Sequence, residues 1–139
     1  IAPNDVMAIQ LGSRFLDETT QGPQFANMHS LRRPHQSVSD AIRERDKFMK
    51  DKLQQARCYA KAGDRASALY ALGEAIHPLM DSISPAHIGL REWNPMNPLR
   101  LWGHSPFEGI GIETATDITE FDYQIMDSVI VDAYSSVFK

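Results

Sequence analysis

Cysteine is almost absent from this chain, and there is no strong excess of charge. The single cysteine, Cys58, among 139 residues excludes a framework of internal disulfide bonds. No apolar run approaches the roughly 20 residues that a membrane-spanning helix requires. The net charge of -4 argues against a protein that grips a nucleic-acid backbone through a basic face. These absences are typical of one globular domain of ordinary composition, spanning residues 1–139.

Several familiar motifs are missing as well. The chain has no phosphate-binding P-loop, no dinucleotide fingerprint, no nucleophile elbow and no internal repeat. It begins at Ile1 and carries no signal-peptide pattern. We therefore expect a piece or a processed product of a longer polypeptide, secreted or delivered as part of it.

Helical periodicity dominates what remains and predicts an all-α fold. We expect helices over residues 6–16, 37–62, 65–83 and 117–138, with Asn4 or Asp5 capping the first and Ser37 or Ser39 opening the second. Gly63 and Asp64 should end the second helix and cap the third, which makes the two an antiparallel hairpin.

The third helix is apolar on nearly all sides, so it is expected to be central and buried. The residues predicted to face the core from the other helices are Val6, Ile9, Phe15, Leu16, Ile42, Phe48 or Met49, Leu53, Ala56, Cys58, Tyr59 or Ala60, Ile118, Phe121, Ile125, Met126, Val129, Ile130, Ala133, Tyr134 and Val137. The stretches 18–36 and 84–116 read as loops, because prolines, glycines and polar residues interrupt any period.

Histidines and acidic residues recur at metal-ligand spacings. His77 and Asp81 stand four apart on the predicted central helix and therefore share one face of it. His87 follows, and His104 and Glu108 repeat the same spacing. Burying His77 and Asp81 is costly unless each finds a partner, and zinc binds both imidazole nitrogen and carboxylate oxygen. The alternative is an ion pair without metal.

The ordered pattern D-x11-H, LGxxxHxxxDxxxPxH and HxxxE, from Asp17 to Glu108, resembles the bacterial zinc-dependent phospholipases C and the related zinc-dependent single-strand nucleases. The resemblance implies a compact helical domain of the zinc-dependent phospholipase C type with long metal-binding loops. It implies that Asp17, His29, His77 and Asp81 surround one zinc, and that His87, His104 and Glu108 hold a second. The N-terminal tryptophan and first-helix histidine that help to hold a third zinc in that family have no counterpart here.

Clustered zinc ions would neutralise a phosphodiester and activate a water molecule for attack. We therefore expect a zinc-dependent phosphodiesterase. Asp17 is the first candidate for catalytic base and its neighbour Glu18 the second, while Glu74, one turn before His77, is expected to orient that imidazole.

The acidic charge and the closer likeness to the phospholipase branch favour cleavage of a phospholipid headgroup at a membrane surface over cleavage of nucleic acid. Phe25, Trp93 and Trp102 are candidate substrate-binding residues, although packing roles are open for both tryptophans. The chain also resembles the C-terminal toxin of an Rhs-type effector, which implies a cognate immunity protein. The remaining alternative is a non-catalytic helical interaction domain with a structural metal, although such sites are usually rich in cysteine.

Overall fold

The computed structural model describes residues 1–83, 87, 89–93 and 120–139, and within them the protein is all-α. The helices are α1 (Pro3–Thr19), the 3-10 helix η1 (Pro23–His29), α2 (Val38–Lys61), α3 (Arg65–Ser82) and α6 (Glu120–Phe138). No strand forms among these residues, where a single parallel bridge joins Arg32 to Glu92. The predicted all-α class is therefore confirmed for these residues. None of the described helices is long and apolar enough to cross a bilayer.

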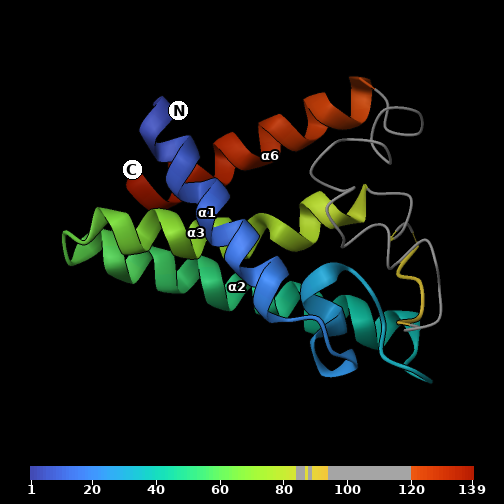
Figure 1. The fold of residues 1–139 in the computed structure, drawn as a ribbon. Coiled ribbons are helices and arrows are strands. Elements are labelled where there is room, and N and C mark those ends of the chain that lie inside the picture. The colour runs from blue at the N-terminus through green and yellow to red at the C-terminus, as the bar shows by residue number, and fades with distance from the viewer. Residues whose placement is uncertain (84–86, 88, 94–119) are drawn as a thin grey trace.

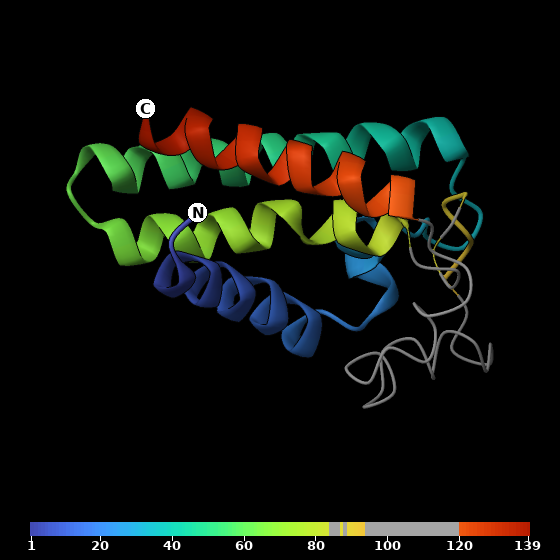
Figure 2. The ribbon, with the colours of Figure 1, turned by 90° about the horizontal axis from the view of Figure 1, so that it is seen from above.

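Helix α3 is the centre of the molecule, as predicted. Figures 1 and 2 show α1 on one side of it and α2 on another, with α6 laid along α2 and α3. Eight consecutive residues of α3, from 71 to 78, are buried. The core consists of Ile9, Ala56, Ala68, Leu69, Ala71, Leu72, Ile76 and Val137. Whatever polar groups α3 carries in this stretch must therefore find partners inside the protein.

The antiparallel hairpin of α2 and α3 is confirmed together with its caps. The Ser37 side chain accepts a hydrogen bond from the Asp40 backbone N–H at 3.1 Å, which opens α2. Gly63 adopts a φ of 82°, a left-handed conformation that suits a residue without Cβ. Asp64 then accepts from the Ser67 N–H at 3.1 Å and starts α3. Local sequence signals thus determine this turn.

Helices α1 and α3 approach each other closely at two glycines, where any larger residue would collide with the facing backbone. Gly12 of α1 lies against the Tyr70 carbonyl, and Gly73 of α3 lies against the Ile9 carbonyl, so a Cβ at either glycine would collide with backbone. The approach brings the C-terminal end of α1 beside the second half of α3. It is this geometry that places Asp17 opposite His77.

The interpretation of residues 18–36 as one loop was wrong for two parts of that stretch. Helix α1 continues to Thr19, and η1 occupies Pro23–His29. Ser30 then turns the chain with a φ of 51°, and its hydroxyl donates to the Pro78 carbonyl of α3. Pro23 stands at the first position of η1, which suits proline, and the contact from Ser30 folds this segment onto the central helix.

Other expectations about the core also need correction. Cys58 is exposed on α2 and does not belong to the core. The exposed residues that had been expected to face inward are Val6, Phe15, Ile42, Ile125 and Val129. In α2 the buried positions are Ala41 and Ala56. Small residues let α2 lie close to its neighbours, so the larger apolar side chains beside them sit at the edge of the contact. Helix α1 begins at Pro3 without a side-chain cap, and Asp5 is engaged elsewhere.

Candidate metal centre

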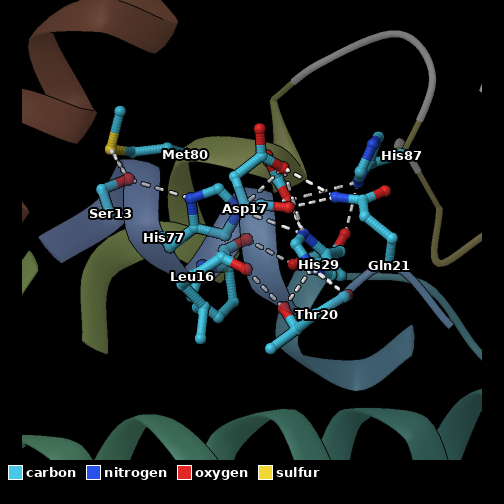
Figure 3. Close-up of polar contacts among 12 residues, drawn as sticks. Ser13, Leu16, Asp17, Thr20, Gln21, His29, His77, Met80 and His87 are labelled. Carbon is cyan, nitrogen blue, oxygen red and sulfur yellow. Dashed lines mark hydrogen bonds and ion pairs between the residues drawn. The ribbon is translucent and has the colours of Figure 1, made fainter. Parts of the chain in front are cut away.

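Four of the predicted ligands come together from three separate elements. Asp17 lies at the end of α1, His29 closes η1, and His77 and Asp81 lie one turn apart on α3. Figure 3 shows the side chains of Asp17, His29 and His77 directed toward one another, with His87 to one side. His29, His77 and Asp81 are buried, whereas Asp17 keeps 25% of its side chain exposed. The cluster therefore has one face that meets solvent.

The facing atoms of the cluster are spaced as ligands of one cation would be. His29 Nδ1 lies 3.0 Å from His77 Nε2, and Asp81 Oδ2 lies 3.1 Å and 3.0 Å from these two nitrogens. Asp17 Oδ1 lies 3.7 Å from His29 Nδ1 and 3.8 Å from His77 Nε2. Zinc with ligands at about 2.1 Å in a tetrahedron separates them by about 3.4 Å. The observed separations bracket this value.

The hydrogen bonds of the two imidazoles direct a lone pair of each ring toward the centre. His29 Nε2 lies 2.8 Å from the Thr20 carbonyl oxygen, which can only accept, so Nε2 carries the proton. His77 Nδ1 lies 2.9 Å from Ser13 Oγ on its outer side. When both rings are neutral with their protons on these outer nitrogens, two lone pairs face each other 3.0 Å apart. A positive charge between them removes the repulsion.

The electrostatics of the buried pair also favour positive charge at this point. Burial lowers the pKa of His77, but the neighbouring Asp81 carboxylate outweighs burial and raises it above its usual value. Burial raises the pKa of Asp81, yet the imidazoles of His77 and His87 outweigh it and hold that pKa well below its usual range. Two carboxylates beside two neutral imidazoles carry a charge that one divalent cation would balance. The donor set therefore fits a metal ion.

His87 is brought to the edge of the same cluster. It is fully buried, its Nδ1 donates to the His29 carbonyl, and that nitrogen lies 3.6 Å from Asp81 Oδ2. The proton on Nδ1 means that the neutral ring keeps its lone pair on Nε2. His104, Glu108 and Trp102, which complete the predicted second zinc site and substrate cleft, lie outside the described residues.

Two predicted supporting residues face away from the cluster. Glu74 Oε2 accepts from Lys52 Nζ at 2.7 Å across the α2–α3 groove, so the expected contact with His77 is replaced by an ion pair. Glu18 is exposed and pairs with Arg14 at 2.7 Å along the outside of α1. Helical geometry explains Glu18, because adjacent residues on a helix point in different directions. Glu74 lies one turn from His77 on α3, and its ion pair with Lys52 turns its carboxylate toward α2.

Two of the predicted aromatic residues, Phe25 and Trp93, belong to the described part of the chain. Phe25 is half-buried in η1. Trp93 is also half-buried, and its Nε1 donates to the Gln21 carbonyl at 3.3 Å, just beyond Asp17. Backbone hydrogen bonds between Arg32 and residues 91 and 93 hold the tryptophan there. Its packing role is thus evident, and a substrate role stays a prediction.

Sequence reasoning missed two hydroxyl residues that contact the histidines. They are Ser13, beside His77, and Thr20, beside His29. A signal was available, because Ser13 and Thr20 stand four before and three after Asp17 and so share its helical face. It was overlooked because the first helix was expected to end at Leu16. No family model, curated protein or solved structure matches the chain significantly.

Proposed function

We propose that this protein is a zinc-dependent phosphodiesterase of the phospholipase C and single-strand nuclease type. The observation that carries the proposal is the convergence of Asp17, His29, His77 and Asp81 on one point from α1, η1 and α3. This is the set, in chain order, that the resemblance assigns to one zinc. Nitrogen and oxygen donors with little sulfur are the choice of hydrolytic zinc sites.

The bound ion would polarise the phosphoryl oxygen and activate water for hydrolysis. The protein's part in this chemistry is to hold its ligands in place and to leave access on the side of Asp17. Asp17 is the ligand with an exposed carboxylate, and Gln21 Nε2 donates to its Oδ1 at 3.3 Å. Asp17 is therefore better placed than Glu18 to accept a proton from water at the mouth of the site.

The preferred substrate in this proposal is the headgroup phosphodiester of a phospholipid. The net charge of -4 supports it, because a nuclease would be expected to offer a basic surface to its substrate. Phe25 and Trp93 are half-buried and would contact the lipid; Trp93 donates to the carbonyl of Gln21, whose side chain contacts Asp17. Single-stranded nucleic acid is the alternative substrate, and the experiment below tests it alongside the lipid.

A structural role for the metal is the competing class of function. It is favoured by the near-complete burial of three of the four ligands, since closed four-ligand zinc sites are typically structural. The two roles differ in a simple way. A structural metal supports the fold without turnover, whereas a hydrolytic metal is needed for turnover on at least one phosphodiester.

The test measures metal content and turnover on the same purified protein. Bound zinc is determined by elemental analysis, and hydrolysis is followed on bis(p-nitrophenyl) phosphate, on phospholipid vesicles by release of diacylglycerol, and on single-stranded DNA by nicking. We expect stoichiometric zinc, loss of turnover on chelation and recovery on adding Zn²⁺. His77→Ala and Asp81→Asn should lose both zinc and turnover.

His35→Asn is the matched control for these variants. His35 is an exposed histidine with a φ of 65°, a conformation that asparagine tolerates, and it lies away from the cluster. It should keep wild-type zinc content and rate. Diacylglycerol release supports the lipid assignment, and nicking alone would replace it with the nuclease. Stoichiometric zinc without turnover on any of the three substrates would overturn the hydrolase proposal in favour of a structural metal.

A further inference from the structure

The hydroxyl of Thr20 donates one hydrogen bond and accepts another. Thr20 caps the end of α1, where its Oγ1 donates to the Leu16 carbonyl at 2.6 Å. Because its one proton is used there, Oγ1 can only accept from His29 Nε2, which lies 2.8 Å away. The Thr20 carbonyl accepts from the same nitrogen at 2.8 Å. One residue therefore contacts the outer nitrogen of His29 with two acceptors.

Ser13 stands in the corresponding position behind His77. Its Oγ lies 2.9 Å from His77 Nδ1 and donates to the Met80 thioether at 3.9 Å. With its proton directed to sulfur, the hydroxyl accepts from Nδ1–H and leaves the lone pair on Nε2. The two rings thus use different nitrogens, Nδ1 of His29 and Nε2 of His77, and these are the two atoms 3.0 Å apart at the centre.

We propose that Ser13 and Thr20 are positioning residues that fix the tautomer and the orientation of the two histidines, so that both lone pairs meet at the metal. The proposal rests on the metal centre of the proposed function but does not depend on which substrate, if any, is turned over. A ring free to exchange tautomers would present N–H to the ion for part of the time and bind it less well. Groups that hold a ligand in this way typically contribute 10–100-fold to metal affinity.

Ser13 and Thr20 lie on the same side of the C-terminal part of α1 as Asp17. Ser13, Asp17 and Thr20 follow at helical spacing on the face turned to α3 and η1. The last two turns of α1 therefore supply one ligand and the partners of two others. The positioning role is therefore tested by measuring the affinity of the protein for a metal ion, independently of any catalytic activity.

Thr20→Val tests the proposal, because valine keeps the branched shape and removes the hydroxyl. The Thr20 carbonyl still accepts from His29 Nε2 in this variant, so only the share of the hydroxyl is lost. We expect Co²⁺, titrated into chelator-treated protein and followed by its visible absorption, to bind about 10-fold more weakly, with an altered spectrum. Thr20→Ser restores the hydroxyl and should recover wild-type affinity. Ser13→Ala should weaken binding similarly, and the double variant should show about the product of both losses because the hydroxyls act on different rings.

Thr19→Val is the matched control. The Thr19 hydroxyl donates to the Phe15 carbonyl at 2.7 Å at the same end of α1, but it contacts neither histidine. Both threonine variants lose a helix-end hydrogen bond, so their metal-free unfolding midpoints should fall alike, while only Thr20→Val should lose Co²⁺ affinity.

Wild-type affinity in Thr20→Val, or an equal loss in Thr20→Ser and Thr20→Val, would overturn the positioning role. Wild-type protein that folds without binding Co²⁺ or Zn²⁺ would overturn both this role and the metal centre. Tight Co²⁺ binding that depends on Thr20, in a protein inactive on every phosphodiester, would support the positioning role while the hydrolase proposal fails.

Discussion

At the residue scale, the ion pair of Glu74 is expected to affect the stability of the fold but not the affinity for metal. Its carboxylate is largely buried and has Lys52 as ion-pair partner at 2.7 Å. Lys52→Met should leave that carboxylate without its cation and lower the free energy of unfolding by about 1–3 kcal/mol. Metal affinity should stay unchanged, because Glu74 faces α2 and not His77. Urea unfolding and Co²⁺ titration measure the two quantities.

Lys47→Met is the control for this variant, since Lys47 belongs to an exposed ion pair with Asp51 on the same helix. Its removal should change little. If Lys52→Met instead weakened metal binding as strongly as Ser13→Ala, Glu74 would have to act on His77 after all, as the spacing of the two residues first indicated.

His77 and Asp81 were predictable as candidate ligands from their spacing, because few other roles place such residues inside an apolar helix. Asp17 and His29 followed only from the resemblance to a known family. Ser13 and Thr20 are common helix-surface types, and only the packing of α1 against α3 and η1 shows that they meet imidazoles. Likewise Glu74 lies one turn from His77, yet the direction of its side chain depends on Lys52 in another helix.

At the element scale, the glycine contact between α1 and α3 sets the distance between Asp17 and His77 of the candidate metal centre. Gly12→Ala would place a Cβ against the Tyr70 carbonyl, a backbone atom that cannot move aside alone. We expect a loss of about 1–3 kcal/mol in the free energy of unfolding from overpacking. Because the helices would separate, Asp17 should also move away from His77, and Co²⁺ affinity should fall.

The control is Gln10→Ala, an exposed position on the same helix, where the change should be within about 0.5 kcal/mol. Denaturant unfolding compares the two variants, and Co²⁺ titration follows the site. Unchanged affinity in a destabilised Gly12→Ala would mean that the cluster assembles independently of the α1–α3 spacing.

Element boundaries were predictable where capping is local and not where tertiary contacts decide. Ser37, Gly63 and Asp64 act within their own turns, so the hairpin of α2 and α3 followed from the sequence. Helix η1 did not, because it is short, a glycine precedes it, and its position depends on contacts with α3 such as Ser30 to Pro78. The inward faces of α2 and α6 were predicted in part. Ala56, Met126 and Val137 are buried as expected, whereas Ile42, Ile125 and Val129 are exposed.

On the scale of the whole molecule, α1 is fastened to α3 at both ends. Near its C-terminus the link is the candidate metal centre, where Asp17 Oδ1 lies 3.8 Å from His77 Nε2. Near its N-terminus the link is Asp5, which pairs with Arg65 at the start of α3 and accepts from the Tyr134 hydroxyl of α6 at 2.7 Å. Arg65 also lies over the Phe138 ring at 4.4 Å. No local pattern announces this second link, because its members are separated by up to 129 positions.

The Asp5 link should make the stability of the metal-free protein depend on pH. The hydrogen bond from Arg65, followed by that from Tyr134, holds the pKa of Asp5 below its ordinary value of 3.8. Because the folded pKa is the lower one, the ionised carboxylate stabilises the fold above pH 3.8 and loses this effect as the pH falls through the folded pKa. Asp5→Asn should therefore be less stable than wild type at pH 7, and the difference should shrink at pH below 3.8. Urea midpoints in the presence of chelator, with the exposed Asp46→Asn as control, measure it; a difference that stays constant with pH would mean that Asp5 contributes through packing and not through its charge.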